Sequence, residues 1–173
     1  MIRRMIAGAA LVLVVVGAAM ADEMQGNKDD MMKSMQKEMM NCMVCKNMAP
    51  HMAELMPSMT MEIVTLNNGT AYMHGVTDPS KVELLHSCGA KMEESGAAAM
   101  ALSDADAKTQ LCGPCQGMRT MVVNGASMSM GQTEMGDIMV FSSDDPAVQE
   151  KIWAYEQEMR QMMAMHEQAM MEG

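Results

Sequence analysis

The chain has 173 residues, a formal net charge of −10 at neutral pH, and 30 methionines against one Trp, one Phe and two Tyr. Phosphate groups would repel so acidic a chain, which argues against nucleic acid and anionic membranes as partners. The sequence contains no P-loop, serine-hydrolase or zinc-protease motif, so hydrolytic enzyme function has no support either.

Residues 1–21 have the features of a signal peptide. Arg3 and Arg4 form a positive start, residues 6–16 are apolar, and the segment ends in Ala-Met-Ala, the small-x-small pattern of signal peptidase sites. The apolar stretch is shorter than the about 20 residues that span a membrane. We therefore expect a secreted protein, in the bacterial periplasm, that begins at Asp22 and has no membrane attachment after cleavage.

The first half of the mature chain predicts a helix that carries a cysteine pair. Residues 22–30 are polar and are expected to form a flexible lead. From Met31 methionines recur every four residues, which is typical of a helix. This helix would present Cys42 and Cys45 on one continuous face and break near Ala49, where Pro50 follows.

A β-hairpin and a second helix follow this segment. Residues 60–66 and 70–76 are predicted strands, and Asn68-Gly69 between them is the signal of a type I′ turn. Thr77-Asp78-Pro79 starts a helix that is expected to end at Gly96.

The second half shows the same order of elements. After a linker at residues 97–102, a helical stretch starts at Ser103 and meets Cys112-Gly113-Pro114-Cys115, where Pro114 would restart the helix. Residues 127–133 and 137–141 are predicted strands, and a final helix starts at Asp145-Pro146.

The chain therefore predicts two helix-strand-strand-helix repeats, residues 31–96 and 103–173. Five residues recur at an offset of 67: Gly69, Asp78, Pro79, Glu83 and Met92. Three recur at an offset of 70: Cys42, Cys45 and Met48. Such matches predict an internal duplication and an α+β fold, with two hairpins joined in one antiparallel sheet and helices on one face, or docked as separate lobes.

The five cysteines permit three interpretations. In an oxidising compartment, closely spaced cysteines commonly form local disulfides, but an odd number leaves one thiol over. Alternatively, Cys42, Cys45 and Cys88, with His86, would bind Cu(I) or Zn(II), since soft ions prefer thiolate and imidazole ligands. Of His86 and Cys88, Cys88 is the preferred ligand, because residues two apart on a helix do not share a face.

The second pair favours redox chemistry. Cys112 would lie at a new helix N-terminus, where the helix dipole lowers a thiol pKa. Cys112-Gly113-Pro114-Cys115 resembles the thioredoxin active-site motif, and the segment around Cys42 and Cys45 resembles its surroundings through the residues Lys46, Ala49, Pro50, Glu54 and Leu55. This resemblance implies thiol–disulfide exchange at Cys112 and Cys115. The same two cysteines are also candidate metal ligands.

A second resemblance concerns the repeat itself. Ser142-Ser143-Asp144-Asp145-Pro146, followed by an amphipathic helix, resembles a repeat of small bacterial exported proteins rich in Cys and Met. It implies export and no particular reaction. Further candidate ligands are thioethers and imidazoles near the cysteines or on the last helix: Met48, His51, Met52, His74, His166 and Met170.

These observations favour a binding protein over an enzyme. The first hypothesis is an exported soft-metal-binding protein, with Cu(I) preferred to Zn(II), that sequesters or delivers metal or confers resistance. Its partners would be the ion and a metal transporter or another exported thiol protein. The alternatives are a thiol–disulfide oxidoreductase that uses Cys112 and Cys115, and a structural domain whose methionines scavenge oxidants.

Overall fold

The computed structural model describes residue 34 and residues 36–171, with side chains as far as residue 165. The predicted signal peptide and flexible lead lie outside the described residues, as do the side chains of His166 and Met170. No helix in the described part of the chain is both long enough and apolar enough to cross a membrane.

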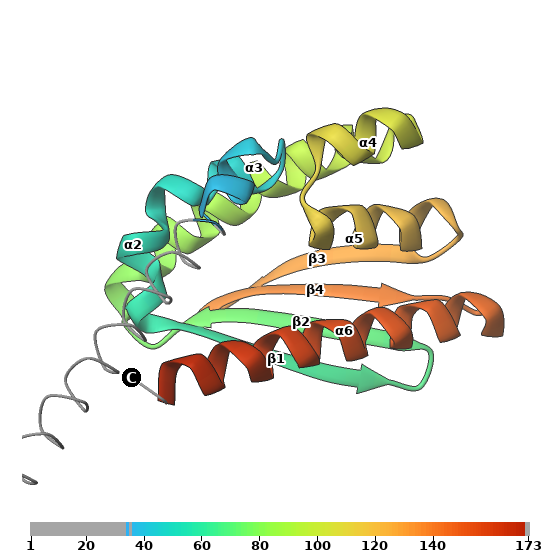
Figure 1. Cartoon of the computed structure of the whole chain (residues 1–173). Coiled ribbons are helices and arrows are strands. Elements are labelled where there is room, and N and C mark those ends of the chain that lie inside the picture. Colours follow the sequence, from blue (N-terminus) through green and yellow to red (C-terminus); the bar gives the residue numbers. More distant parts are fainter. Residues whose placement is uncertain (1–33, 35, 172–173) are drawn as a thin grey trace, which may run out of the picture.

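One four-stranded antiparallel sheet forms the centre of the fold (Figure 1). Its strands are β1 (Met59–Leu66), β2 (Gly69–Val76), β3 (Ser127–Thr133) and β4 (Gly136–Ser142). They lie in the order β1-β2-β4-β3, so the two hairpins join along β2 and β4. The predicted α+β class with a single sheet is confirmed.

The pairing of the strands follows the offset of 67 that the sequence shows. Thr60 lies opposite Gly75 in the first hairpin, and Ser127 lies opposite Ser142, 67 residues later, in the second. Between the hairpins Tyr72 lies opposite Met139, its own counterpart at the same offset. A local twofold axis therefore passes between Tyr72 and Met139.

The first hairpin turn differs from the prediction. Leu66 pairs with Gly69, so Asn67 and Asn68 form the turn. In the described chain Gly125 is the only residue with a positive φ, and a type I′ turn needs two. Gly69 is instead required inside β2, because a Cβ there would overlap the backbone carbonyl oxygen of Phe141.

Two long helices occupy equivalent places in the two repeats. α3 (Val82–Met100) follows a 3-10 turn at Pro79–Lys81, and α6 (Pro146–Met171) follows the second hairpin. Asp78 Oδ1 accepts a hydrogen bond from the backbone N–H of Ser80, and Asp145 Oδ1 accepts one from Ala147, both at 2.9 Å. The predicted starts of these helices are thus formed by the same cap.

The predicted end of α3 at Gly96 is wrong. The helix continues through Gly96 to Met100, so the connection to the second repeat is shorter than predicted. Alanine is the best helix former and three alanines follow Gly96, which outweighs the modest cost of one helical glycine. Ala99, which is 1% exposed, is buried against the cysteine region and fixes this last turn.

The continuous helix expected around the first cysteine pair is also not formed. Residues 36–41 are helical, but the chain turns at residues 42–44 and goes on as short segments: η1 (Cys45–Asn47), η2 (Ala49–His51), α2 (Met52–Leu55) and η3 (Met56–Ser58). The N–H of Met43 donates to the carbonyl of Gln110 at 2.9 Å. A bond to the second repeat thus replaces a helical one.

The corresponding region of the second repeat breaks as predicted. α4 (Asp104–Gln110) ends before Cys112, and α5 (Gly113–Val123) starts with Pro114 in its first turn. Arg119 of α5, although buried, forms an ion pair with Asp104 of α4 at 2.9 Å. This pair holds the two short helices at a fixed angle around the cysteines.

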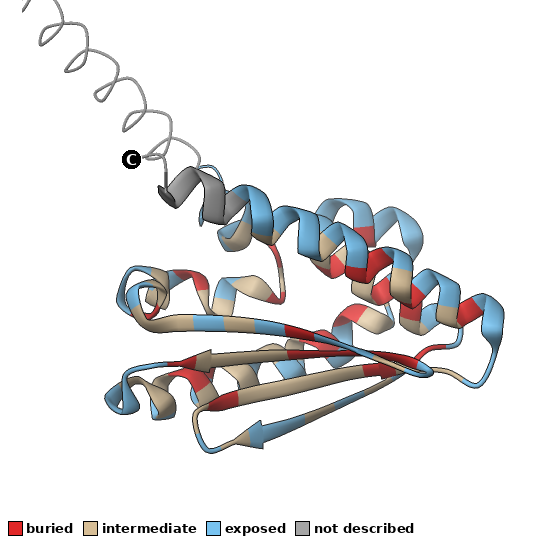
Figure 2. Ribbon diagram, turned by 90° about the horizontal axis from the view of Figure 1, so that it is seen from below, coloured by how far each residue is buried: buried red, intermediate tan, exposed pale blue. Residues whose placement is uncertain are grey.

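The core lies on one face of the sheet. Towards one end, Ile63, Tyr72 and Phe141 pack against Ile152 of α6 and Met121 of α5. Towards the other end, Val76 packs against Leu85 of α3 and Leu55 of α2, and both of these side chains are at most 1% exposed. In Figure 2 the buried positions gather where the helices face the strands.

A substitution at Gly136 tests the close approach of β2 and β4. A Cβ at Gly136 would overlap the backbone carbonyl oxygen of His74, so Gly136→Ala is expected to lower the free energy of unfolding by about 3 kcal/mol. The matched control is Gly96→Ala, where a Cβ meets nothing within 4 Å. It should raise stability by up to about 1 kcal/mol. Urea unfolding followed by circular dichroism measures both, and equal effects would contradict the register.

Candidate metal centre

The two cysteine pairs meet in one place. The sulfur atoms of Cys42, Cys45, Cys112 and Cys115, here called the cysteine cluster, all lie within 4.8 Å of one another. Cys45 Sγ lies 3.4 Å from Cys115 Sγ and 3.7 Å from Cys112 Sγ. Cys42 and Cys115 are buried, whereas Cys45 and Cys112 are partly exposed.

Local breaks in the chain position the four sulfurs. Cys42 follows the end of a helix, and Cys45 opens η1. Cys112 is the N-cap of α5, and Cys115 lies in its first turn. Because both pairs lie at chain breaks rather than within continuous helices, each can direct two side chains towards the other pair.

Packing and hydrogen bonds hold the two segments together. Val44 and Leu111, both buried, pack with Ala99 and Ala107 around the cluster. Gln116 Nε2 donates to the carbonyl of Leu111 at 2.8 Å, which fixes the backbone just before Cys112. The thiols are therefore preorganised by groups that do not themselves bind metal.

The spacing fits a tetrahedral ion. A Zn–S bond is about 2.3 Å long, so the sulfurs of a tetrahedral site lie about 3.8 Å apart. The distances from Cys45 Sγ to the sulfurs of Cys115 and Cys112, 3.4 and 3.7 Å, are near this value. All five cysteines are free thiols in the structure. Four cysteine ligands in this geometry are compatible with Zn(II) and other soft ions.

The four thiols do not share one acidity. Hydrogen bonding with Cys112 lowers the pKa of Cys42, and hydrogen bonding with Cys115 lowers that of Cys112. Hydrogen bonding with Cys112 raises the pKa of Cys45 and of Cys115. The first cysteine of each pair is thus the more acidic of the two.

Cys88 and His86, predicted to complete a site with the first pair, lie elsewhere. Cys88 is buried among Leu55, Val76 and Leu85, and burial raises the pKa of its thiol. His86 Nε2 donates to the backbone carbonyl of Gly136 at 3.0 Å, so that nitrogen is not free to bind an ion. The structure brings the second cysteine pair to the first instead.

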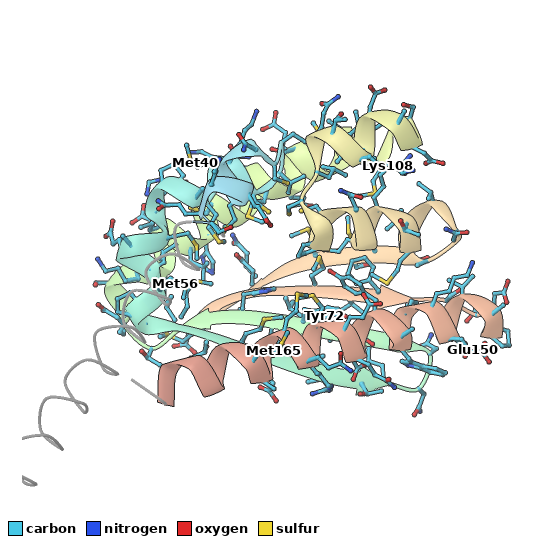
Figure 3. The ribbon with its side chains drawn as sticks, in the orientation of Figure 1. Met40, Met56, Tyr72, Lys108, Glu150 and Met165 are labelled. Carbon is cyan, nitrogen blue, oxygen red and sulfur yellow. The ribbon has the colours of Figure 1, made fainter. Side chains whose placement is uncertain are left out.

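A large cavity adjoins the cysteine cluster. It has a volume of about 330 Å³ and lies between the helices and the sheet. Pro114 and Cys115 are among its lining residues. Twelve methionines line it: Met39, Met48, Met52, Met59, Met61, Met92, Met100, Met118, Met128, Met130, Met139 and Met159. We call it the methionine cavity. Figure 3 shows side-chain sulfurs gathered in this region, with Tyr72 between the sheet and α6.

Few polar groups face the methionine cavity. His74, Asp137 and Glu93 line it, together with Tyr72, whose buried hydroxyl has no hydrogen-bond partner among the described residues. Burial lowers the pKa of His74 and raises that of Asp137. The sequence marks His74 only as a further candidate ligand, because no local pattern shows that β2 directs its side chain towards so many thioethers.

The remaining candidates are divided by the fold. Met48 and Met52 line the methionine cavity, whereas the neighbouring His51 is not among its lining residues. A second recess, of about 310 Å³, reaches the cysteine cluster from the surface. It is lined by Cys42 and Cys112 and by the exposed residues Glu38 and Asn41. The cluster therefore borders two hollows, the methionine cavity at Cys115 and this recess at Cys42 and Cys112.

Comparison with known proteins gives no relative. No protein-family model matches the chain, and neither a curated protein nor a solved structure is significantly similar to it.

Cobalt binding tests the cysteine cluster. The reduced protein should bind one Co(II) with the strong visible and near-ultraviolet absorption of tetrahedral thiolate coordination. Replacing Cys42, Cys45, Cys112 or Cys115 singly with Ser should weaken binding by at least about tenfold, because each supplies one of four ligands. Cys88→Ala is the control and should bind as the wild type does. Octahedral spectra, or a loss with Cys88→Ala, would contradict the assignment.

Proposed function

We propose that this chain is an exported protein that binds Cu(I) at the cysteine cluster and sequesters or delivers it. One observation carries the proposal, namely the four sulfur atoms within 4.8 Å of one another, two from each repeat. Thiolate sulfur is the ligand that soft ions such as Cu(I) prefer. Export rests on the signal peptide expected at residues 1–21.

The methionine cavity favours Cu(I) over Zn(II). Thioethers suit soft ions and are poor ligands for zinc. A zinc site of four cysteines would need no further ligands. Here, however, twelve thioethers line the adjoining cavity, and Cys115 belongs both to the cysteine cluster and to the lining of that cavity. Thioethers also cannot be lost as ligands through disulfide formation, which matters in an oxidising compartment.

The surroundings of the cluster support exchange of the ion. The recess at Cys42 and Cys112 opens beside Glu38, and the net charge of −10 attracts cations to the protein. A fully enclosed structural site would have no such access. We therefore propose a role in handling the ion, with a metal transporter or another exported thiol protein as its recipient.

Metal exchange tests this function. The mature reduced protein, loaded with one Zn(II), should release it on addition of one equivalent of Cu(I) under anaerobic conditions, because thiolates hold Cu(I) more strongly. A chromogenic zinc chelator measures the release, and a Cu(I) chelator of known affinity measures the Cu(I) that is bound.

The control for this exchange is Cys88→Ala, in which the cysteine cluster is intact. It should release zinc as the wild type does. If zinc stays bound in the presence of excess Cu(I), the cluster is a structural zinc site and the proposed function is wrong.

A thiol–disulfide function is the second candidate, favoured by the position of Cys112. It is partly exposed, caps α5, and has a lowered pKa through hydrogen bonding with Cys115. As a thiolate it would attack a substrate disulfide and form a mixed disulfide. Cys115 would then displace the substrate thiol, leaving the substrate reduced and the Cys112–Cys115 pair oxidised.

Two variants separate the candidates. With a small dithiol as the reductant that regenerates the Cys112–Cys115 pair, a redox protein should reduce an aromatic disulfide reagent catalytically, lose this activity in Cys112→Ser and keep it in Cys42→Ser. A metal-binding protein should lose Cu(I) affinity in both variants, because both residues belong to the cluster. Turnover that survives Cys112→Ser would exclude the redox candidate.

A further inference from the structure

A row of side chains crosses the sheet beneath the methionine cavity. Met61 of β1 lies opposite His74 of β2, and His74 lies opposite Asp137 of β4. Residues that lie opposite each other in antiparallel strands have their side chains on the same face. All three line the methionine cavity, so this face is the one that the helices cover.

The strand register brings thioether groups close to the His74 imidazole. The Cβ atoms of opposite residues are about 5 Å apart, and those of diagonal neighbours are about 7 Å apart. Met61 is the opposite neighbour of His74 on β1, and Met139 is a diagonal neighbour on β4. A methionine side chain is long and flexible enough to cover such distances.

From this arrangement we propose a second Cu(I) site inside the methionine cavity, formed by the imidazole of His74 and the thioethers of Met61 and Met139. Imidazole and thioether together suit copper and do not suit zinc well. The proposal rests on the proposed function only for the identity of the ion. It shares no ligand with the cysteine cluster, so each can fail alone.

The neighbouring polar groups fit a bound cation better than an empty apolar cavity. A buried charge is costly unless a group of opposite charge lies nearby. Asp137, directly opposite His74, supplies a carboxylate in the same row. Its other neighbour, the His86 imidazole, lies 3.9 Å away and is already engaged with the Gly136 carbonyl. Asp137 can therefore compensate the charge of an ion at His74.

Two further observations indicate space for a ligand beside His74. Within residues 36–165, the His74 ring makes no hydrogen bond, although His86 does. Tyr72, two residues earlier on the same face of β2, is 2% exposed and its hydroxyl has no partner in the described chain. Buried polar groups usually have partners, and the Tyr72 hydroxyl, which has none in the described chain, faces the same cavity as the half-buried His74.

The two sites would have different tasks. The cysteine cluster offers thiolates and should fill first. The thioether site should bind more weakly, and it should still bind when the thiols are oxidised, because a thioether forms no disulfide. Since Cys115 lines the same cavity, the second site can hold an ion beside the first.

Silver titration tests the second site, with Ag(I) as a redox-inert probe for Cu(I). Wild-type protein labelled with ¹³C at the methionine methyl groups is titrated in its reduced form. The first equivalent should bind at the cysteines and leave the Met61 and Met139 signals in place. The second should shift both signals, and native mass spectrometry should show two bound ions.

Variants assign the ligands. His74→Gln and Met61→Leu should each weaken the second site at least tenfold without changing the first. Asp137→Asn should weaken it less. The matched control is Met165→Leu. Met165 has the same side chain as Met61 but is 61% exposed, so this substitution should change neither site. Leucine conserves the volume of methionine, so Met61→Leu and Met165→Leu should fold.

The outcomes separate this proposal from the proposed function. If the first equivalent already shifts Met61 and Met139 and no second ion binds, the second site exists and the cysteine cluster is not a site for soft ions. If the second equivalent shifts only exposed methionines such as Met40, which is 51% exposed, and His74→Gln has no effect, the second site does not exist.

Discussion

The pairing of β2 with β4 is the interaction on which the rest of the structure depends. It joins two hairpins that could otherwise have stayed separate, and it relates the repeats by a local twofold axis near Tyr72 and Met139. The strands can approach so closely because Gly69 and Gly136, equivalent residues at opposite ends of the interface, carry no Cβ that would overlap a backbone carbonyl. Both cysteine pairs then lie on the same side of the sheet and can meet.

Methionine gives this fold an unusual interior. A core built from branched and aromatic side chains would leave little space, since protein interiors are as dense as organic crystals. Here the aromatic contacts are confined to one end, where Tyr72 packs edge-on against Phe141 and Tyr155 at centroid distances of 6.0 and 6.2 Å. Between this end and the end where Leu55, Val76 and Leu85 pack together, flexible thioethers surround the methionine cavity. The packing is thus tight at both ends of the sheet and loose around the methionine cavity between them.

The strands and long helices could be predicted from the sequence because their signals are local. A high content of Ile, Val and Thr marks β1, and a capping Asp before Pro marks the start of α3 and of α6. The role of Gly69 is predicted wrongly for a different reason. Gly69 looks like a turn residue beside Asn68, and its actual constraint comes from a strand in the other repeat.

The sequence predicts which cysteines are candidate ligands, but it does not predict that the two pairs meet in one cluster. Both pairs were recognisable by spacing, but the break of the helix at residue 42 depends on a hydrogen bond from Met43 to Gln110. No local pattern encodes such a bond. The position of His74 above a cavity depends likewise on β-strand register and on helices from both repeats, which sequence periodicity does not fix.

The repeats differ at the position of Cys88. In the second repeat this residue is Tyr155 of α6, whose hydroxyl donates to the carbonyl of Pro114 at 3.0 Å and whose ring lies against Gly117. Tyr155 is therefore a tether between the last helix and the turn that carries Cys112 and Cys115. Any rearrangement of that turn on occupancy by an ion would strain this tether and reach α6. The asymmetry makes the second repeat, and not the first, the mechanical link between the thiols and the C-terminal helix.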